Sequence, residues 1–401
     1  MPMDYNEKPK LIPMSSPDLS PAEIDAVISV MHTTSLSMGT HIQAFEEAVK
    51  SFTGARFAIG VNSGTAGLHL CVRAADIQPG DLVVTTPFSF VASTNVILFE
   101  KGIPVFVDVD PLTGNIDVAR LTCVVDDLMA GGSAARKWLP RRGAENIHRL
   151  KALLPVDVFG QPADLDPIRT LADRYDLKVI EDSCEALGSE YKGRKAGRLG
   201  DYGVFGFYPN KQITTGEGGM IVTDDPQAAG LMQALRNQGR APGDTWLSHT
   251  FLGYNYRMDE LSAALGNAQM QRIDHLMQTR QQVADWYAVR LSEIPGIEVP
   301  ALEPTTTRSS WFVYVIRLPQ GVNRVALADK LAAEGVPVRP YFLPIHLQPY
   351  MVEQFGYQPG DFPVTEDLGA RGLALPFSGV MTEEQVDSVC RSLQKALQTT
   401  N

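Results

Sequence analysis

The chain has 401 residues, of which 44% are hydrophobic and 20% charged, and its formal net charge is −11. This composition is typical of a globular protein, and the length predicts two or three domain-sized units or one large domain with a smaller one attached. No apolar run approaches the roughly 18–20 residues of a membrane-spanning helix, and the polar N-terminus lacks the apolar part of a secretion signal. The acidic balance argues against nucleic acid as a partner. We therefore expect a cytoplasmic protein that binds neither membranes nor nucleic acid.

The four cysteines are widely spaced and form no CxxC pair; they are Cys71, Cys123, Cys184 and Cys390. This spacing indicates neither a zinc site nor a disulfide framework. We expect reduced thiols, as in a cytoplasmic protein, and no metal.

From about residue 55, apolar strands alternate with helical patterns. Strands are predicted at 56–63, 81–87, 103–110, 150–160, 177–183, 203–208 and 218–225, and helices at 65–75, 90–102 and 164–176. Continuous apolar strands separated by helices predict an α/β fold, in which a mostly parallel sheet is covered on both faces.

The rhythm is interrupted by residues 119–147, which contain GGSAAR and LPRRGAEN and are predicted to form an insertion or mobile loop. One long helical pattern then runs over 259–294 and ends near a proline. The rest predicts a smaller α/β domain, with strands at 311–318 and 336–342 and helices at 325–335 and 382–397. We expect a large domain over 12–260, followed by a connecting helix and a small C-terminal domain over 261–401.

Lys211 lies in FYPNKQITTGEGGMIVTDD, between an aromatic strand and a glycine-rich segment. A lysine that forms a Schiff base must be unprotonated part of the time, which a partly desolvated position provides. Gly216, Gly218 and Gly219 permit close backbone approach. Alone, a lysine in such a turn is more often a solvated surface charge.

Asp182 follows an apolar strand, at the end where ligands of open α/β sheets bind. A carboxylate there could hold a pyridine nitrogen protonated, so that the ring accepts electrons. The alternative for an isolated aspartate at this point is the N-cap of a helix.

Two further elements fit a flat, phosphorylated ligand. In VNSGTAGLHL, a strand, a small-residue turn and a helix start present backbone N–H groups and the hydroxyls of Ser63 and Thr65 to a phosphate. Phe90, just after a strand end, could stack on a ring, although an isolated phenylalanine usually packs in a core.

In this order and spacing, the four elements resemble the fold-type I pyridoxal-phosphate (PLP) enzymes of the DegT/DnrJ/EryC1/StrS family, the sugar aminotransferases. The resemblance runs from about Ser35 to Leu397 and includes FVDVDPLTGNID, VFGQPADLDPI, RNQGR, LGYNYRMDELSAALGNAQMQRID, LPIHLQPY and LALPFSGVMTEEQVD. It implies a large domain with a mostly parallel sheet of the seven-stranded type and a smaller C-terminal α/β domain.

The resemblance also implies site residues. Lys211 would bind PLP covalently and later move protons, Asp182 would pair with the pyridinium nitrogen, and Phe90 would stack on the ring. The phosphate would be cradled by Gly64, Thr65 and Ala66.

Other implied positions concern the partner subunit and the substrate. In many family members a residue of the LGYNYRM segment reaches the phosphate in the neighbouring subunit's site, which makes Asn255 and Arg257 candidates and implies a homodimer. Tyr341 and His346 would lie near the sugar-binding mouth, although His346 alone would more often be an ordinary polar loop residue.

Three residues depart from the family pattern. Gly206 stands where a serine commonly contacts the phosphate, and Asp157 where a histidine is usual. Glu185 replaces a glutamine near the phenolic oxygen of the cofactor. Its carboxyl is expected either to be ionised, to donate a hydrogen bond in its protonated form, or to turn away and pair with Arg194 or Lys195.

The implied reaction has two halves. An amino donor, expected to be L-glutamate, converts PLP to pyridoxamine phosphate, and a nucleotide-linked keto-sugar then accepts the amine. Lys211 argues against the dehydratase branch of the family, which typically has histidine there. An aminotransferase for a cyclitol or an antibiotic precursor would use the same residues, and a non-catalytic sensor that binds PLP is a further alternative.

Overall fold

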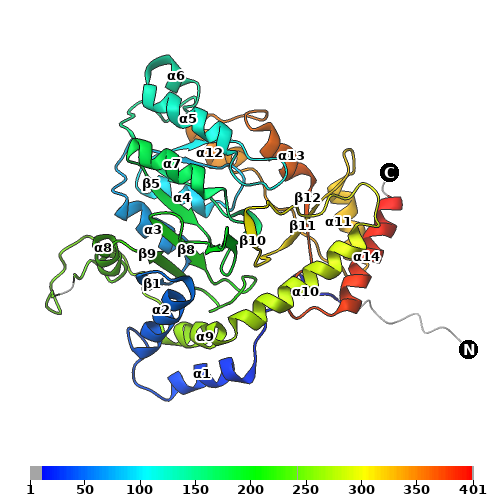
Figure 1. The fold of residues 1–401 in the computed structure, drawn as a ribbon, viewed down its shortest axis with the longest axis horizontal. Helices are drawn as coiled ribbons and strands as arrows, with labels where there is room; N and C mark the ends of the chain where they lie inside the picture. The colour runs from blue at the N-terminus through cyan, green and yellow to red at the C-terminus, as the bar shows by residue number, and fades with distance from the viewer. Residues whose placement is uncertain (1–10, 242, 400–401) are drawn as a thin grey trace, which may run out of the picture.

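A seven-stranded sheet forms the centre of the larger part of the molecule (Figure 1). The computed structural model describes residues 11–241 and 243–399. The strand order is β1-β9-β8-β5-β4-β2-β3, and only β9 runs antiparallel to its neighbours. The strands are β1 (Phe57–Val61), β2 (Leu82–Thr85), β3 (Ile103–Phe106), β4 (Leu150–Leu154), β5 (Lys178–Asp182), β8 (Tyr202–Gly206) and β9 (Gly219–Thr223). The predicted α/β fold class is confirmed.

Successive strand residues face opposite sides of this sheet, and both sides are covered. Val83 lies in a core under one group of helices, whereas Val84 lies in a core on the other side. The covering helices include α3 (Gly64–Ala74), α4 (Ala92–Phe99), α5 (Val118–Ala130), α7 (Leu165–Tyr175) and α8 (Pro226–Arg236). Burial on both faces explains why the strands are continuous apolar runs in the sequence.

Part of the segment predicted as an insertion or mobile loop, 119–147, is helical. Helix α5 begins at the N-cap Asp117, whose side chain accepts the Arg120 N–H, and it buries Leu121, Val124 and Val125. That spacing is one face of a helix, which the glycines and prolines that follow had obscured. A short helix, α6 (Gly132–Arg136), comes next.

The long helical pattern over 259–294 is two helices, α9 (Glu260–Gln271) and α10 (Ile273–Leu291), separated at Arg272. Helix α9 packs on α1 (Pro21–Met31) and α2 (Thr40–Thr53), while α10 continues from the large part of the molecule to the small domain (Figure 1). Arg272 bridges Asp18 and Glu23 on the α1 side, at 2.7 and 2.8 Å. The break thus changes the direction of the chain without changing its apolar period.

The small domain packs α10, α11 (Arg324–Ala333) and α14 (Glu383–Gln398) around the antiparallel pair β11 (Tyr314–Arg317) and β12 (Gly372–Leu375). The strand predicted at 336–342 is wrong: only an isolated bridge joins Arg339 to Ala374 there. Pro337 and Pro340 lack the N–H groups that a ladder requires.

The remaining elements are the three-stranded sheet β10 (Thr306–Arg308), β6 (Glu190–Tyr191) and β7 (Arg194–Lys195), the 3-10 turns η1 (Val158–Gly160) and η2 (Ile345–Leu347), and helices α12 (Pro349–Phe355) and α13 (Pro363–Arg371).

Within residues 11–241 and 243–399, no helix combines the length and the apolar character that crossing a membrane requires. The predicted domain bounds, 12–260 and 261–401, stay a prediction.

Candidate active site

A cavity of about 410 Å³ lies at the carboxyl ends of β5 and β8, beside the start of α3. It brings together seven of the residues predicted from the sequence: Gly64, Thr65, Phe90, Asp182, Glu185, Lys211 and Tyr341. These residues span most of the chain, so the fold assembles what the motifs contained separately. Ligands of open α/β sheets bind at this edge.

Lys211 lies in the loop between β8 and β9 and points its amine into this cavity. The Nζ atom is 3.4 Å from Glu185 Oε1 and 3.7 Å from the centroid of the Phe312 ring. The side chain is only 14% exposed. The amine is therefore largely removed from bulk water, which favours a reactive amine, while one carboxyl group and one aromatic face contact it.

Asp182 ends strand β5, and its carboxylate is held by two donors. Ser93 Oγ donates to Oδ2 at 2.7 Å, and the Cys184 N–H donates to Oδ1 at 3.2 Å. Turns rather than a helix follow Asp182, so the N-cap alternative is wrong. The group is a buried, oriented carboxylate in the wall of the cavity, positioned to bind a protonated nitrogen.

The start of helix α3 provides a site for an anion. Ser63 is the N-cap, and its Oγ accepts the Ala66 N–H at 3.0 Å. Among the described residues, nothing accepts from the N–H groups of Gly64 and Thr65. Unused donors at a helix N-terminus, together with the helix dipole, favour a phosphate. Of the three residues predicted to bind the phosphate, Gly64 and Thr65 therefore keep an unused N–H group, whereas the Ala66 N–H donates to the N-cap Ser63.

Close packing around this turn leaves no space for side chains. A Cβ at Gly64 would lie 2.8 Å from Cys184 Sγ, and one at Gly219 would lie 2.6 Å from the Ser63 carbonyl oxygen. At Gly206 the nearest atom would be Cys184 Cβ at 3.4 Å, so the serine that is common in the family would fit there.

An anion site, a buried carboxylate and a buried amine around one cavity fit the phosphate, ring nitrogen and aldehyde of PLP.

Glu185 is buried and faces Lys211. Its Oε2 accepts the Phe159 N–H at 2.9 Å, and burial raises the pKa of its carboxyl, against the opposing effects of Lys211 and that N–H group. The alternative pairing with Arg194 or Lys195 is wrong, since Asp166 and Glu190 pair with those side chains.

Phe90 and Tyr341 lie at different depths of the cavity. The Phe90 side chain is 62% exposed, which leaves one face of the ring available for stacking. Tyr341 is half-buried, and burial, with a contribution from Glu185, raises its pKa to about 12. Its hydroxyl therefore stays protonated and can donate to a ligand.

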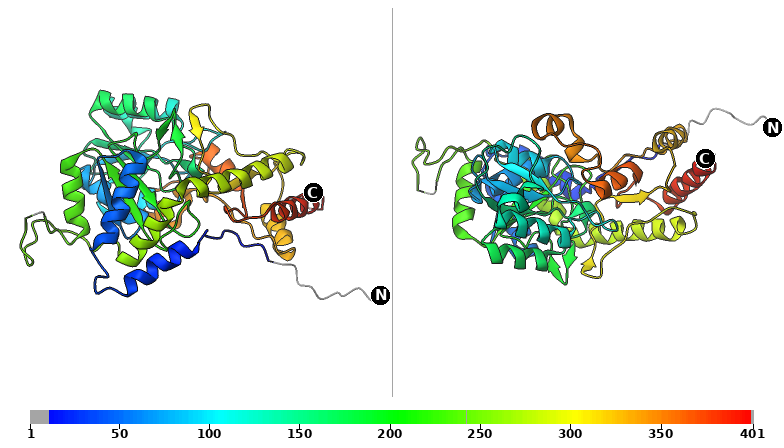
Figure 2. Two further views of the ribbon diagram at one scale, coloured as in Figure 1. Left: turned by 60° about the horizontal axis from the view of Figure 1, so that its bottom comes forward. Right: turned by 90° about the horizontal axis from the view of Figure 1, so that it is seen from above.

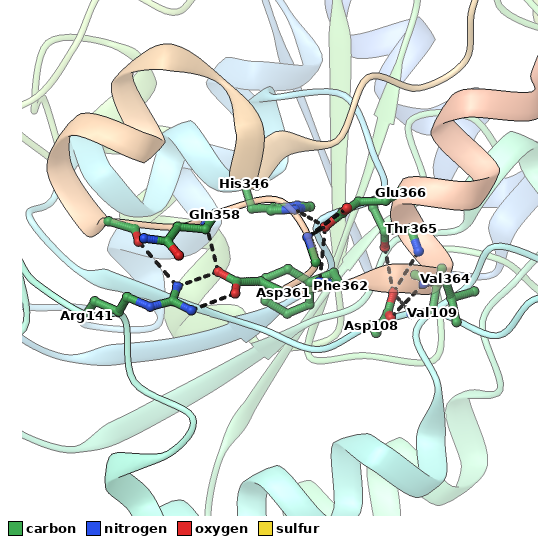
Figure 3. A network of polar contacts seen from close by, with 12 residues as sticks. Asp108, Val109, Arg141, His346, Gln358, Asp361, Phe362, Val364, Thr365 and Glu366 are labelled. Carbon is green, nitrogen blue, oxygen red and sulfur yellow. Dashed lines mark hydrogen bonds and ion pairs between the residues drawn. The ribbon is translucent and has the colours of Figure 1, made fainter.

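His346 is not brought into the cavity. The residue is fully buried, and its Nε2 lies 3.0 Å from Glu366 Oε1, within the network of Figure 3. Glu366 also accepts the N–H groups of Gly360 and Phe362. This pairing fixes a loop of the fold and leaves His346 without access to a ligand, against its predicted place at the sugar-binding mouth.

Asn255 and Arg257 also lie outside this cavity. Asn255 is exposed, with its carbonyl oxygen 3.3 Å from Asn62 Nδ2, and an Arg257 guanidinium nitrogen donates to Asn237 Oδ1 at 3.1 Å. Neither residue therefore lines the cavity of its own chain.

Asp157 lies behind the site rather than in it. Its carboxyl is fully buried, accepting from Ser183 Oγ at 2.6 Å and from the Ala163 N–H at 2.9 Å. Burial, aided by the nearby Glu181, raises its pKa well above the ordinary value. The Asp157 N–H also donates to the Asp182 carbonyl at 3.0 Å, a backbone contact that a histidine would keep, so the departure from histidine changes only the side-chain contacts with Ser183 and Ala163.

Sequence reasoning missed Ser93, Cys184 and Phe312, which also line the cavity. Ser93 lies three residues after Phe90 and Cys184 two residues after Asp182, so their places in the sequence could have identified them. Phe312 comes from the small domain, about which the motifs around Lys211 carry no information.

The chain matches known proteins over nearly its whole length. Residues 17–394 match the sequence profile of the DegT/DnrJ/EryC1/StrS aminotransferase family. GDP-perosamine synthase of Caulobacter vibrioides is 36% identical over 389 residues, covering 96% of this chain and 98% of that protein.

Solved structures agree with this match. PseC of Helicobacter pylori, an aminotransferase of pseudoaminic acid biosynthesis, is 27% identical with a TM-score of 0.85, covering 97% of this chain and 100% of that one. DesV of S. venezuelae is 28% identical with a TM-score of 0.85, covering 98% and 100%.

Proposed function

Because the chain belongs to the DegT/DnrJ/EryC1/StrS family and is a PLP-dependent sugar aminotransferase, we propose that it moves an amino group from L-glutamate to a nucleotide-linked keto-sugar. The product would enter amino-sugar, surface-polysaccharide or secondary-metabolite biosynthesis. The observation that carries the proposal is the meeting of the Lys211 amine and the Asp182 carboxylate in one open cavity. We also propose that the protein acts in the cytoplasm, where its four unpaired cysteines stay reduced.

Different residues of this chain would have different roles in the reaction. PLP, when bound, supplies the electron sink that stabilises charge developing on the substrate carbon. Lys211 would bind the cofactor and carry a proton on its Nζ, the start of α3 would hold the phosphate, and Asp182 would keep a positive charge on the ring nitrogen. Phe312 and Glu185 keep the amine in place and exclude water from it.

Two aromatic side chains of the cavity wall are exposed enough to contact a bound substrate. Phe90 and Tyr208 line the cavity and are 62% and 55% exposed. Flat, exposed aromatic side chains at a mouth can stack on a base or a sugar ring. The relatives named above, a perosamine synthase and an enzyme of pseudoaminic acid biosynthesis, support a sugar substrate.

Half-reactions test this assignment. PLP-loaded protein mixed with L-glutamate and no acceptor should release one 2-oxoglutarate per site and stop. Addition of a nucleotide-linked keto-sugar should then restore the original visible spectrum and yield an amino-sugar nucleotide. A keto-cyclitol serves as the competing acceptor. Turnover with the cyclitol alone would replace the sugar assignment, and no turnover with any donor would indicate a sensor.

We further propose that the active unit is a homodimer. The segment after α8 projects from the body of the molecule, at the end opposite to the small domain (Figure 2). Its residues 243–252, here called the arm, include Trp246, Leu247 and Leu252, which are 78%, 85% and 85% exposed. Clustered exposed apolar side chains favour association. The arm leads directly into Asn255 and Arg257, which would then reach the partner's phosphate.

The dimer proposal predicts that cofactor retention depends on protein concentration. Dilution below the dimer dissociation constant should release PLP and activity together, because binding stabilises only the assembled site. Trp246→Ser with Leu247→Ser should shift that loss to higher concentrations. Val325→Ser is the matched control, since Val325 is 69% exposed on α11 in the small domain. A fully active monomer in sedimentation would contradict the proposal.

Glu185→Gln is expected to leave the pH titration of the visible absorption nearly unchanged. Because burial favours the protonated carboxyl and Phe159 occupies Oε2, Oε1 can donate as an amide would. An ionised carboxylate beside the phenolic oxygen would instead raise the titration pH by about one unit or more, through like-charge repulsion. A downward shift of that size in the variant would therefore contradict the protonated form.

A further inference from the structure

Arg280 is an arginine in the interior of the protein whose hydrogen-bond partners are all carbonyl groups. It lies on α10, and the residue is 4% exposed. Among the described residues, no carboxylate lies within 4.0 Å of its guanidinium. The negative charge of Asp18 favours the charged guanidinium of Arg280, but Asp18 forms its ion pair with Arg272. A charge buried without an ion-pair partner is costly, so its retention calls for a reason.

The carbonyl groups belong to two segments that meet at the active site. One guanidinium nitrogen donates to the carbonyl oxygens of Trp311, at 3.0 Å, and Phe312, at 3.4 Å. The other donates to those of Lys211, at 2.5 Å, and Asn210, at 3.5 Å. The first segment leads into the small domain, and the second is the lysine loop of the large sheet.

These contacts bind the backbone from which the Lys211 amine and the Phe312 ring project. Its Nζ is 3.7 Å from the Phe312 ring, and Arg280 binds the backbone of both residues. The planar, forked guanidinium fixes the direction of each donor, which a flexible ammonium does not. The Phe377 ring lies 5.8 Å from the guanidinium carbon and adds a third contact from the small domain. Although burial lowers the pKa of Arg280 to about 10, the group remains charged at neutral pH.

We propose that Arg280 is a positioning residue, which holds the lysine loop against Phe312 and so couples the small domain to the amine that binds the cofactor. This role rests on the proposed function of Lys211. Arg280 acts through the backbone and does not line the large cavity. Its effect should therefore appear in how fast Lys211 reacts, because a displacement of about 1 Å can cost a reacting pair about a hundredfold in rate.

The test uses cofactor-free, full-length protein and measures how fast PLP combines with Lys211, by borohydride trapping and peptide mapping. Arg280→Met should slow this step at least about tenfold and lower kcat more than it raises KM for the amino donor. Arg280→Lys should recover only part of the rate, because an ammonium cannot present paired donors to both segments.

Arg236→Met is the control for burial. Arg236 is 6% exposed on α8 and donates to Glu46 and to the Gly60 carbonyl, neither of which lines the cavity. This variant should lose stability while PLP combines with Lys211 at the wild-type rate.

Equal slowing in Arg280→Met and Arg236→Met, or no slowing in either, would overturn the inference. If Arg280→Met does not fold, Arg280→Lys is compared with Arg236→Met instead. A wild-type rate of PLP binding in Arg280→Lys would then overturn the inference. Failure of the wild-type protein to label at Lys211 would refute the proposed function instead, so the two failures are distinguishable.

Discussion

Lys211→Ala is expected to lower transamination at least about a thousandfold and to abolish borohydride fixation of PLP, while the protein remains folded. The variant removes both the group that binds the cofactor and the group that moves the proton, and proton transfer alone contributes about 10²–10⁴ in rate. The fold should survive because, within the described part of the chain, the hydrogen bond, ion pair and ring contact of the amine are with Glu185 and Phe312 alone. Glu185 would then lose the opposite charge of Lys211, which favours the protonated form of its buried carboxyl still further.

Lys195→Ala is the matched control for this experiment. Lys195 pairs with Glu190 at 2.7 Å on a small sheet and does not line the cavity. Its loss should leave the fixation of PLP to Lys211 unchanged. Peptide mapping that found the reduced cofactor on any other lysine of the wild-type protein would contradict the assignment, as would near-wild-type turnover by Lys211→Ala.

The sheet was predictable because its strands are buried on both faces. A residue such as Val83 and its neighbour Val84 must both be apolar, which gives runs that are distinct from the helical period. The family match likewise confirms the predicted fold, cofactor and enzyme class. The break at Arg272 could not be predicted in this way. An apolar stripe is compatible both with one straight helix and with two helices whose apolar faces are aligned.

The predicted site residues come together in one cavity where a motif lies next to the end of a strand. Asp182 ends β5, Gly64 begins α3, and Lys211 follows β8, so their shared edge follows from topology. His346 differs, because its environment depends on Glu366, twenty residues further along the chain. A histidine that fixes a loop and one that binds a substrate look the same in a sequence, and tertiary contacts decide between them.

Arg280 illustrates a function that no local pattern carries. It lies in the middle of α10, on the side of the helix that faces the core, where the pattern predicts an apolar residue. The carbonyl groups that it binds belong to the loop that carries Lys211 and to the segment before β11. Arg280 reaches both segments because α10 runs from the large part of the molecule to the small domain. The same helix therefore connects the domains and contacts the loop that carries Lys211.

Asp182→Asn is expected to retain PLP and lower turnover by at least about a hundredfold. The amide oxygen can accept the Cys184 N–H and the amide nitrogen can donate to Ser93 Oγ, so both contacts of the side chain survive. What disappears is the negative charge that keeps the ring nitrogen protonated, and with it the electron-accepting power of the ring. The loss should appear in kcat, with little change in the amount of bound cofactor.

Asp157→Asn provides a close control, because Asp157 is equally buried and leads to the same edge of the sheet through the adjacent strand, yet it does not line the cavity. Its contacts with Ser183 and Ala163 are also ones that an amide can reproduce. Since burial raises the pKa of Asp157 well above its ordinary value, its folded form favours the neutral group, and the substitution should cost little.

A large fall in kcat for Asp182→Asn beside a small one for Asp157→Asn would tie the effect to the charge facing the cofactor. Equal falls would assign it to the buried polar support of β5, and near-wild-type turnover by Asp182→Asn would remove that carboxylate from the mechanism.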